Sequence, residues 1–326
     1  MGIAKFLIFI FICIQSIQFD AAYAQSTYPR KSIRIIVPFP PGGANTTISR
    51  IVGEKLTVSW GQQVLIDNRA GGNTIIGTDA LVRSPPDGYT LIMVSSAHAI
   101  NHLLLPNIPY DALKDFSSIA TIASTEQLLV THPSLPVKNL KEFIALAKSK
   151  PDQLNYGSSG TGGVQHLAGE FFCILAGIKM RHIPYKGGGP AIVDLIGGHI
   201  HSYFSATSVA FPLINDKKIK AIAISGELRM KSMPDILTFS ESGLDKFDVK
   251  GWFVLLAPAN TPREIVDKIS SELGKIVNAD DVKEKLISQG QNPFYLNPTQ
   301  TSEMIKSSIN RYSNIIKTAN IKLDQF

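Results

Sequence analysis

Two glycine-rich segments, each at the start of an expected helix, are the places where this sequence could do chemistry. Residues 38–43 read PFPPGG and follow the apolar run 33–37, and residues 157–163 read GSSGTGG and follow the expected strand 154–156 (LNY). A glycine-rich turn lets backbone N–H groups approach a ligand. The unpaired N–H groups of the first helical turn, together with the helix dipole, then favour an anion. Ser158, Ser159 and Thr161 add hydroxyls that can donate to carboxylate oxygens.

The first segment continues into Asn45 and Thr46, either of which can cap the following helix while presenting its side chain to a ligand. Ordinary turns would use the same residue types, because glycine also serves positions that need a positive φ. One such segment alone favours the ordinary turn. Two segments in matching contexts leave both interpretations open.

Enzymatic chemistry finds little support in these segments. Residues 157–160 do not satisfy G-x-S-x-G, and neither segment carries G-x-G-x-x-G or the lysine of a phosphate-binding loop. A secreted α/β serine hydrolase using Ser159 and His166 remains as an alternative. His199 and His201 could share one face of a strand but have no third ligand at a recognisable spacing, so we expect no metal site and no cofactor.

Short apolar runs alternate with stretches of helical spacing along the chain. Two helix starts are signalled, by Asn139 with Glu142 three residues on and by a capping box with proline at residues 261–264 (TPRE). This alternation predicts an α/β fold with largely parallel sheets. The expected strands are residues 33–37, 64–66, 91–94, 128–130, 154–156, 221–224 and 253–256.

The two glycine-rich segments have the same design, a strand followed by a loop and an amphipathic helix. This similarity fits two α/β domains that face each other across a cleft, with the loops beyond the carboxyl ends of the strands. The expected core positions of the two helices are Ile48, Ile51, Val52 and Leu56 in the first, and Val164, Leu167, Phe171 and Leu175 in the second.

The first 24 residues have the pattern of a secretory signal peptide. One lysine precedes nine apolar residues at 6–14 (FLIFIFICI), and small residues stand at the A-x-A positions 22 and 24. Nine apolar residues are far fewer than the roughly 20 that span a bilayer. We therefore predict cleavage before Gln25 and export. Cys173 is then the only cysteine, and we expect it to be a small buried hydrophobe.

Charge argues against nucleic-acid binding. Lys and Arg number 32 and Asp and Glu 26, a net charge of +6, but no run of five or six basic residues occurs. Such a surface suits anionic small molecules without identifying one.

Short motifs follow one another in a recognisable order along nearly the whole mature chain. They are residues 35–43 (IIVPFPPGG), 67–69 (DNR), 77–78 (GT), 85–91 (PPDGYTL), 109–111 (PYD), 114–116 (KDF), 154–160 (LNYGSSG), 166–170 (HLAGE), 183–187 (IPYKG), 252 (W), 257–258 (AP) and 261–262 (TP). In this order they resemble the periplasmic receptors of tripartite tricarboxylate transporters, the Bug (Bordetella uptake gene) family.

The resemblance implies a two-domain periplasmic binding protein, type II-like, with a ligand cleft between domains and a hinge of crossing strands. Domain 1 would hold residues 26–124 and 253–326, and domain 2 residues 125–252. Such a receptor is a monomer in the periplasm of a Gram-negative bacterium. It closes on a small carboxylate (a di- or tricarboxylate, an acidic amino acid or an aromatic acid) and delivers it to membrane permease subunits. A ligand sensor of the same fold, signalling through a membrane partner, stays open as an alternative.

The same resemblance, carried over position by position, implies a set of ligand contacts. From the first half of the chain these are Pro41, Gly42, Gly43, Ala44, Asn45, Thr46, Ser95, Ser96 and His98. From the second half they are Ser158, Ser159, Gly160, Thr161, Tyr185 and Ser205. Lys186 could offer a positive charge or be a solvated residue at the rim.

Three departures from the family pattern bear on the ligand. Thr46 and Ser205 stand where many relatives carry aspartate, and Asn101-His102 stands where many have asparagine–proline. Without the two acidic groups, the ammonium of an amino acid would lose its charged partners. We therefore expect a carboxylate that has no ammonium group.

Overall fold

The computed structural model describes residues 28–105, 107–185, 187–226, 228–230, 233–247 and 249–321. The predicted signal peptide and Lys186 lie outside these residues. Within the part of the chain that is described, no helix combines the length and the apolar character needed to cross a membrane.

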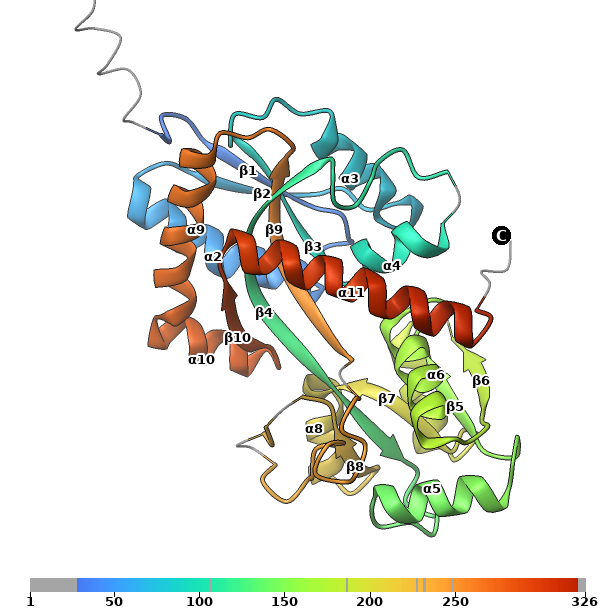
Figure 1. The fold of residues 1–326 in the computed structure, drawn as a ribbon. Coiled ribbons are helices and arrows are strands. Elements are labelled where there is room, and N and C mark those ends of the chain that lie inside the picture. The colour runs from blue at the N-terminus through green and yellow to red at the C-terminus, as the bar shows by residue number, and fades with distance from the viewer. Residues whose placement is uncertain are drawn as a thin grey trace, which may run out of the picture.

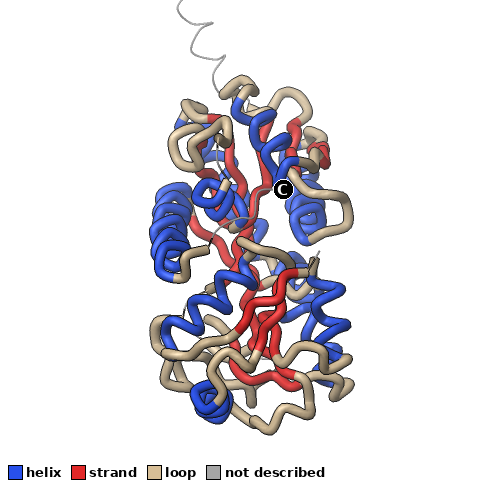
Figure 2. The backbone as a smooth tube through the Cα atoms, turned by 90° about the vertical axis from the view of Figure 1, so that its right-hand side faces the viewer, coloured by secondary structure: helices blue, strands red, loops and turns tan. Residues whose placement is uncertain are grey.

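Two α/β lobes lie one above the other and are joined by strands that run through both (Figures 1 and 2). The ten strands follow the order β2-β1-β3-β9-β4-β7-β5-β6, with β8 and β10 each paired to β4. The strands are β1 Ile33–Val37, β2 Val64–Asn68, β3 Thr90–Ser95, β4 Phe116–Thr131, β5 Asn155–Ser158, β6 Arg181–Pro184, β7 Ser202–Ala206, β8 Lys220–Ile224, β9 Lys250–Pro258 and β10 Asn292–Leu296.

Helices cover both lobes. The first lobe carries α2 to α4 and α9 to α11, and the second carries α5 to α8. The helices are α2 Ala44–Trp60, α3 Ile75–Val82, α4 Ala97–Leu104, α5 Leu140–Ser149, α6 Val164–Ala176, α7 Gly188–Ile196, α8 Thr207–Asn215, α9 Arg263–Asn278, α10 Asp280–Ser288 and α11 Pro298–Thr318, with a short 3-10 helix at Gly72–Thr74.

The sheet is mixed, so the expectation of largely parallel sheets is wrong for its centre. β1 pairs in parallel with β2 and β3, and β5 with β6 and β7. Every pairing of β4 and β9 is antiparallel. The reason is that β4 carries the chain into the second lobe and β9 brings it back. The predicted domain boundaries, after residues 124 and 252, fall inside these two strands and stay a prediction.

The two expected helix faces differ in outcome. In α2, Ile48, Ile51, Val52 and Leu56 are all buried. In α6, Leu167 is buried as expected, but Val164, Phe171 and Leu175 are only partly buried. The neighbouring Phe172 and Cys173 are buried instead. The helix is apolar on most sides, so its period alone could not select the face. Cys173 is a buried free thiol, as expected.

Both predicted helices begin within one residue of the predicted start, but only one of them has the predicted cap. The Asn139 side chain caps α5 by accepting from the backbone N–H of Glu142 at 2.9 Å. The capping box at residues 261–264 is wrong, because α9 begins at Arg263 without a side-chain cap. The Thr261 hydroxyl instead donates to the carbonyl of Pro258 at 2.8 Å and closes the turn after β9.

Helix α11 ties the two lobes together. It runs diagonally across the molecule and packs on α4 of the first lobe and α6 of the second (Figure 1). Ile309 and Tyr312 share an apolar cluster with Leu167 of α6 and with Trp252 of β9. The indole N–H of Trp252 also donates to the Ser308 hydroxyl at 3.2 Å. If the lobes move relative to each other, α11 must therefore either keep its contacts with α6 or slide along that helix.

Candidate functional site

Two adjoining cavities lie between the lobes. The α2 compartment, of about 410 Å³, is lined by residues 39–41, 43–45, 95–96, 125, 127, 164–165, 206 and 253. The α4 compartment, of about 480 Å³, is lined by residues 38–40, 70–71, 73–74, 95–97, 100–101, 104, 159 and 161–164. Both share Phe39, Pro40, Ser95, Ser96 and Val164, so they form one continuous cleft.

The first turn of α2 lies at the cleft, and the backbone N–H groups of this turn have no hydrogen-bond acceptor within the helix. Gly43 is the N-cap in an extended conformation (φ −81°, ψ 172°), no side chain caps it, and no acidic residue stands in the first turn. The N–H of Thr47, which donates to the Gly43 carbonyl at 3.1 Å, is the first to find an intrahelical acceptor. Gly42 has a φ of +94°, which permits the sharp entry.

The first turn of α6 repeats this arrangement from the other lobe. Its N-cap Gly163 is also extended (φ −71°, ψ 165°), uncapped by a side chain and free of acidic neighbours. Leu167 is the first residue whose N–H donates back, to Gly163 at 3.0 Å. Two helix N-termini from opposite lobes therefore meet at one cleft, which favours negative charge there.

Three polar side chains that line the α2 compartment have buried atoms without a partner among the described residues. These atoms are Asn45 Oδ1, Thr125 Oγ1 and Gln127 Oε1, on side chains that are 6%, 9% and 2% exposed. A buried polar atom without a hydrogen bond costs free energy. Asn45 Oδ1 and Gln127 Oε1 are acceptors, so a ligand group that donates, such as a hydroxyl, would remove their cost, whereas the Thr125 hydroxyl can also donate to the ligand.

Charged side chains are absent from the described lining of both compartments. A bound anion would thus be held by neutral donors, the backbone N–H groups and the hydroxyls of residues such as Ser95, Ser96 and Thr161. An ammonium group would find no carboxylate there.

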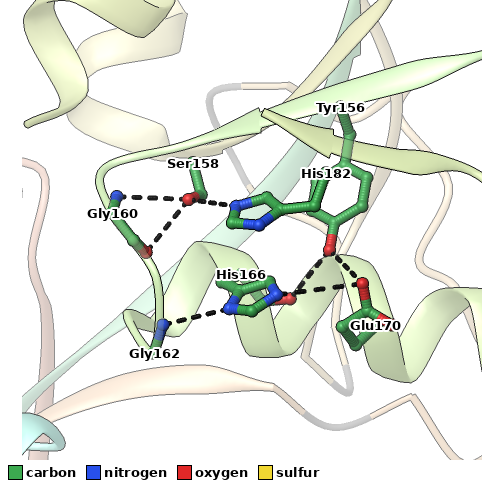
Figure 3. Close-up of polar contacts among 7 residues, drawn as sticks. All are labelled: Tyr156, Ser158, Gly160, Gly162, His166, Glu170 and His182. Atoms are coloured by element: carbon green, nitrogen blue, oxygen red, sulfur yellow. Dashed lines mark hydrogen bonds and ion pairs between the residues drawn. The ribbon is translucent and has the colours of Figure 1, made fainter. Parts of the chain in front are cut away.

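Two histidines hold the second loop from behind (Figure 3). The Ser158 hydroxyl accepts from the N–H of Gly160 at 3.1 Å, donates to the Gly160 carbonyl at 3.0 Å and lies 2.6 Å from His182 Nε2. His166 Nδ1 accepts from the N–H of Gly162 at 3.0 Å. The loop conformation therefore depends on two imidazoles that do not line the cleft.

Both imidazoles are neutral at pH 7. Burial lowers the pKa of His166 to about 4, and burial and the neighbouring His166 lower the pKa of His182 to about 3. The rings stack with centroids 3.7 Å apart, so two positive charges would repel each other. Burial raises the pKa of Glu170, which accepts from the Tyr156 hydroxyl at 2.6 Å.

Eight of the fifteen residues expected at the site line the cleft. They are Pro41, Gly43, Ala44, Asn45, Ser95, Ser96, Ser159 and Thr161.

The other seven do not line either compartment. Gly42, Ser158 and Gly160 shape the two loops. The remaining four have internal partners: the Thr46 hydroxyl accepts from Asn68, His98 contacts the Ala112 carbonyl, the Tyr185 hydroxyl donates to Asp194, and the Ser205 hydroxyl donates to the Ala206 carbonyl.

Several lining residues were not expected from the sequence. Ile100 and Leu104 share one face of α4 with Ala97, at a spacing that an amphipathic pattern could have indicated. Thr125 and Gln127 lie within the long strand β4 and come to the cleft only because that strand crosses between lobes. His182 supports the second loop from β6, and no local pattern links it to Ser158.

The pair expected for a serine hydrolase has other partners. The Ser159 hydroxyl donates to Gln165 Oε1 at 2.7 Å, while His166 accepts from Gly162. Ser158, which does contact an imidazole, is completely buried. Among the described residues, no group of three or more His, Cys, Asp or Glu side chains could hold a metal ion.

Several known proteins are similar to this chain in sequence and fold. The protein BugT of Bordetella pertussis is 33% identical over 99% of this chain and 100% of its own. A Rhodopseudomonas palustris protein solved with adipate is 30% identical with a TM-score of 0.77, covering 90% of this chain and 99% of its own. MatC from Rhodopseudomonas palustris, solved with bound malate, is 27% identical with a TM-score of 0.71, covering 89% and 100%.

The family described as "Tripartite tricarboxylate transporter family receptor" matches residues 48–321. Its members are periplasmic solute-binding proteins of two-domain fold, not enzymes. With a match over most of the chain, and with an architecture in which two helix N-termini meet in a cleft between lobes, this protein belongs to the tripartite tricarboxylate transporter receptor family.

Proposed function

We propose that this protein is a periplasmic receptor for a small carboxylate without an ammonium group, which it delivers to a tripartite tricarboxylate-type membrane permease. Residues 1–24 would direct its export, and β4 and β9 would form the hinge on which the lobes close around the ligand. The observation that carries the proposal is the meeting of the α2 and α6 N-termini at a cleft whose described lining bears no charge.

Neutral donors suit a carboxylate better than an amino acid in this cleft. A carboxylate can accept from N–H groups of both first turns and from hydroxyls, and such charge-assisted hydrogen bonds are strong. An ammonium group would leave water without a compensating charge, which is costly. The relatives solved with adipate and with malate bind ligands of the carboxylate class.

The first expected result is selectivity for carboxylates that lack an ammonium group. Residues 25–326 would be screened by thermal shift and calorimetry against adipate, malate, citrate, nicotinate, aspartate and glutamate, with sugars as controls. A ligand at 100 times its Kd adds about 2.7 kcal/mol and raises the midpoint by about 5–10 °C. Aspartate or glutamate binding at least tenfold tighter than the other carboxylates would overturn the assignment.

The second expected result concerns a single backbone donor. Ala44→Pro removes the N–H of the first residue of α2, a position where proline is tolerated, and Gly43 already has the extended conformation that precedes proline. Losing one hydrogen bond to a charged ligand costs about 1.5–3 kcal/mol, so carboxylate affinity should fall roughly 10- to 100-fold.

Asp280→Pro is the matched control for this variant. It places proline at the first position of α10, after an extended Ala279, where the Asp280 side chain is exposed, and α10 does not line the cleft. Both variants should unfold at nearly the wild-type temperature without ligand. Equal carboxylate affinity in Ala44→Pro and Asp280→Pro would remove the α2 N-terminus from the site.

A further inference from the structure

Two side-chain oxygens in the α2 compartment can only accept hydrogen bonds, and neither finds a donor among the described residues. They are Asn45 Oδ1, in the first turn of α2, and Gln127 Oε1, on β4. The two side chains are only 6% and 2% exposed, so these oxygens are also poorly hydrated. Thr125 stands two residues before Gln127 and therefore lies on the same face of β4, and its hydroxyl also has no partner among the described residues.

A carboxylate cannot satisfy these oxygens, because an ionised carboxylate only accepts hydrogen bonds. Its partners are the N–H groups of the helix N-termini. A ligand that also pairs with Asn45 and Gln127 must carry a second group that donates. An ammonium group donates, but the positive end of the α2 dipole repels it and the described lining of the compartment offers no carboxylate. A hydroxyl donates without carrying a charge.

We infer that the ligand is a hydroxycarboxylate, with Gln127 and Asn45 as the residues that recognise its hydroxyls. A first hydroxyl donates to Gln127 Oε1 and accepts from the neighbouring Thr125 hydroxyl, and a second donates to Asn45 Oδ1. The terminal torsion of an amide side chain is broad, so a small rotation turns each oxygen toward the ligand. The inference rests on the proposed function and adds the second functional group of the ligand.

The free cleft explains why a hydroxyl should improve affinity. Water can donate to both amide oxygens before the ligand enters, and a ligand hydroxyl that displaces this water reproduces its hydrogen bond. A carboxylate without a hydroxyl displaces the same water and leaves a buried oxygen unpaired, which costs free energy.

Affinity along a series with one carbon skeleton tests this inference. Succinate, malate and tartrate share a four-carbon chain and carry no, one and two hydroxyls. Calorimetry on residues 25–326, freed of co-purified ligand, would compare them using each stereoisomer of malate and tartrate, with propanoate and lactate as a shorter pair. The better isomer should gain about tenfold in affinity with each hydroxyl.

Gln127→Met tests the first contact directly, because it removes the amide oxygen at nearly constant volume. Malate should bind this variant about tenfold more weakly, while succinate affinity stays the same. The variant should unfold at no lower temperature than the wild type, because the oxygen that it removes is unpartnered in the free protein.

Gln165→Met is the matched control. Gln165 lines the same compartment, but its Oε1 already accepts from the Ser159 hydroxyl at 2.7 Å. This variant should therefore keep the wild-type ratio of malate affinity to succinate affinity, whatever its effect on both.

The possible failures are distinct. Equal affinity for the hydroxylated and the plain carboxylates, or tighter binding of the plain ones, overturns the inference and leaves the carboxylate receptor standing. An equal fall of succinate and malate affinity in Gln127→Met also overturns it, because Gln127 would then donate to the carboxylate through its amide N–H. A malate preference that Gln165→Met abolishes as well would remove the special role of Gln127. If no carboxylate binds at all, the proposed function fails too.

Discussion

Replacing Gly169 by alanine is expected to lower the free energy of unfolding by about 3 kcal/mol, at the upper end of what overpacking costs. Gly169 lies in α6, where an added Cβ would come within 2.1 Å of Cε2 and 2.4 Å of Cζ of Tyr156. The Tyr156 ring cannot easily move away, because it is completely buried and its hydroxyl donates to Glu170 at 2.6 Å. The helix propensity gained from alanine, about 1 kcal/mol, offsets only part of the cost.

Urea denaturation of the wild type and two glycine variants would measure this effect. Gly189→Ala is the control, because Gly189 lies in α7 and nothing stands within 4 Å of its added Cβ. That variant should be more stable by about 0.5–1 kcal/mol. If Gly169→Ala proved as stable as Gly189→Ala, the close packing of α6 on β5 would be incorrect.

Ligand affinity should fall together with stability in Gly169→Ala. Helix α6 carries the second loop at its N-terminus, and a shift that relieves the contact with Tyr156 moves that loop. Gly189→Ala should keep wild-type affinity, because α7 does not line the cleft.

Acidification from pH 7 to pH 5 is the second change with a large expected effect. The folded protein keeps His166 and His182 neutral, with pKa values of about 4 and about 3, while both take a proton near pH 6.5 when the chain unfolds. Their stabilisation is fully present above pH 6.5 and is lost as the pH falls toward the folded pKa values.

Between pH 7 and pH 5 the free energy of unfolding should fall by about 2–3 kcal/mol for the two rings together. This value includes a discount because His182 is only partly buried. Glu170 acts in the opposite sense. Its raised pKa gives stability at low pH that is lost as the pH rises through the folded value. His98 lies in another part of the core, and burial lowers its pKa to about 4. Like His166 and His182, it therefore stabilises the fold less as the pH falls.

The double variant His166→Asn/His182→Gln isolates the pair. The asparagine oxygen replaces Nδ1 as the acceptor for Gly162, and the glutamine nitrogen replaces Nε2 beside Ser158, but neither titrates. Urea denaturation at pH 5, 6 and 7 should show a pH-dependent loss about 2 kcal/mol smaller than in the wild type. A loss of wild-type size in the double variant would place the sensitive groups elsewhere, with His98→Gln as the next variant to compare.

The first loop and its helix could be predicted from the sequence, because neighbours in the chain determine them. The proline and glycine residues at 38–43, followed by the apolar spacing of Ile48, Val52 and Leu56, require a turn and then a helix, and both are present. The strand at residues 33–37 was likewise predicted with its observed bounds. These features depend on φ preferences and on local hydrophobic periodicity.

The face of α6 and the sheet order could not be obtained in this way. α6 is apolar around most of its circumference, so its buried side was decided by the aromatic cluster of Phe143, Phe204, Phe239 and Phe247 that surrounds Phe172. The central antiparallel pairings follow from β4 and β9 crossing between lobes, and pairing between strands distant in sequence leaves no local signal.

By itself, the sequence determined the two glycine loops, the helices that they open and the kind of charge that those helix N-termini favour, because backbone geometry and the helix dipole are local properties. Only the tertiary structure brought the two loops to one cleft, placed Gln127 and the apolar face of α4 in its wall, and set His182 behind Ser158. Those contacts join residues from distant parts of the chain. They exist only because packing of the two lobes brings them together.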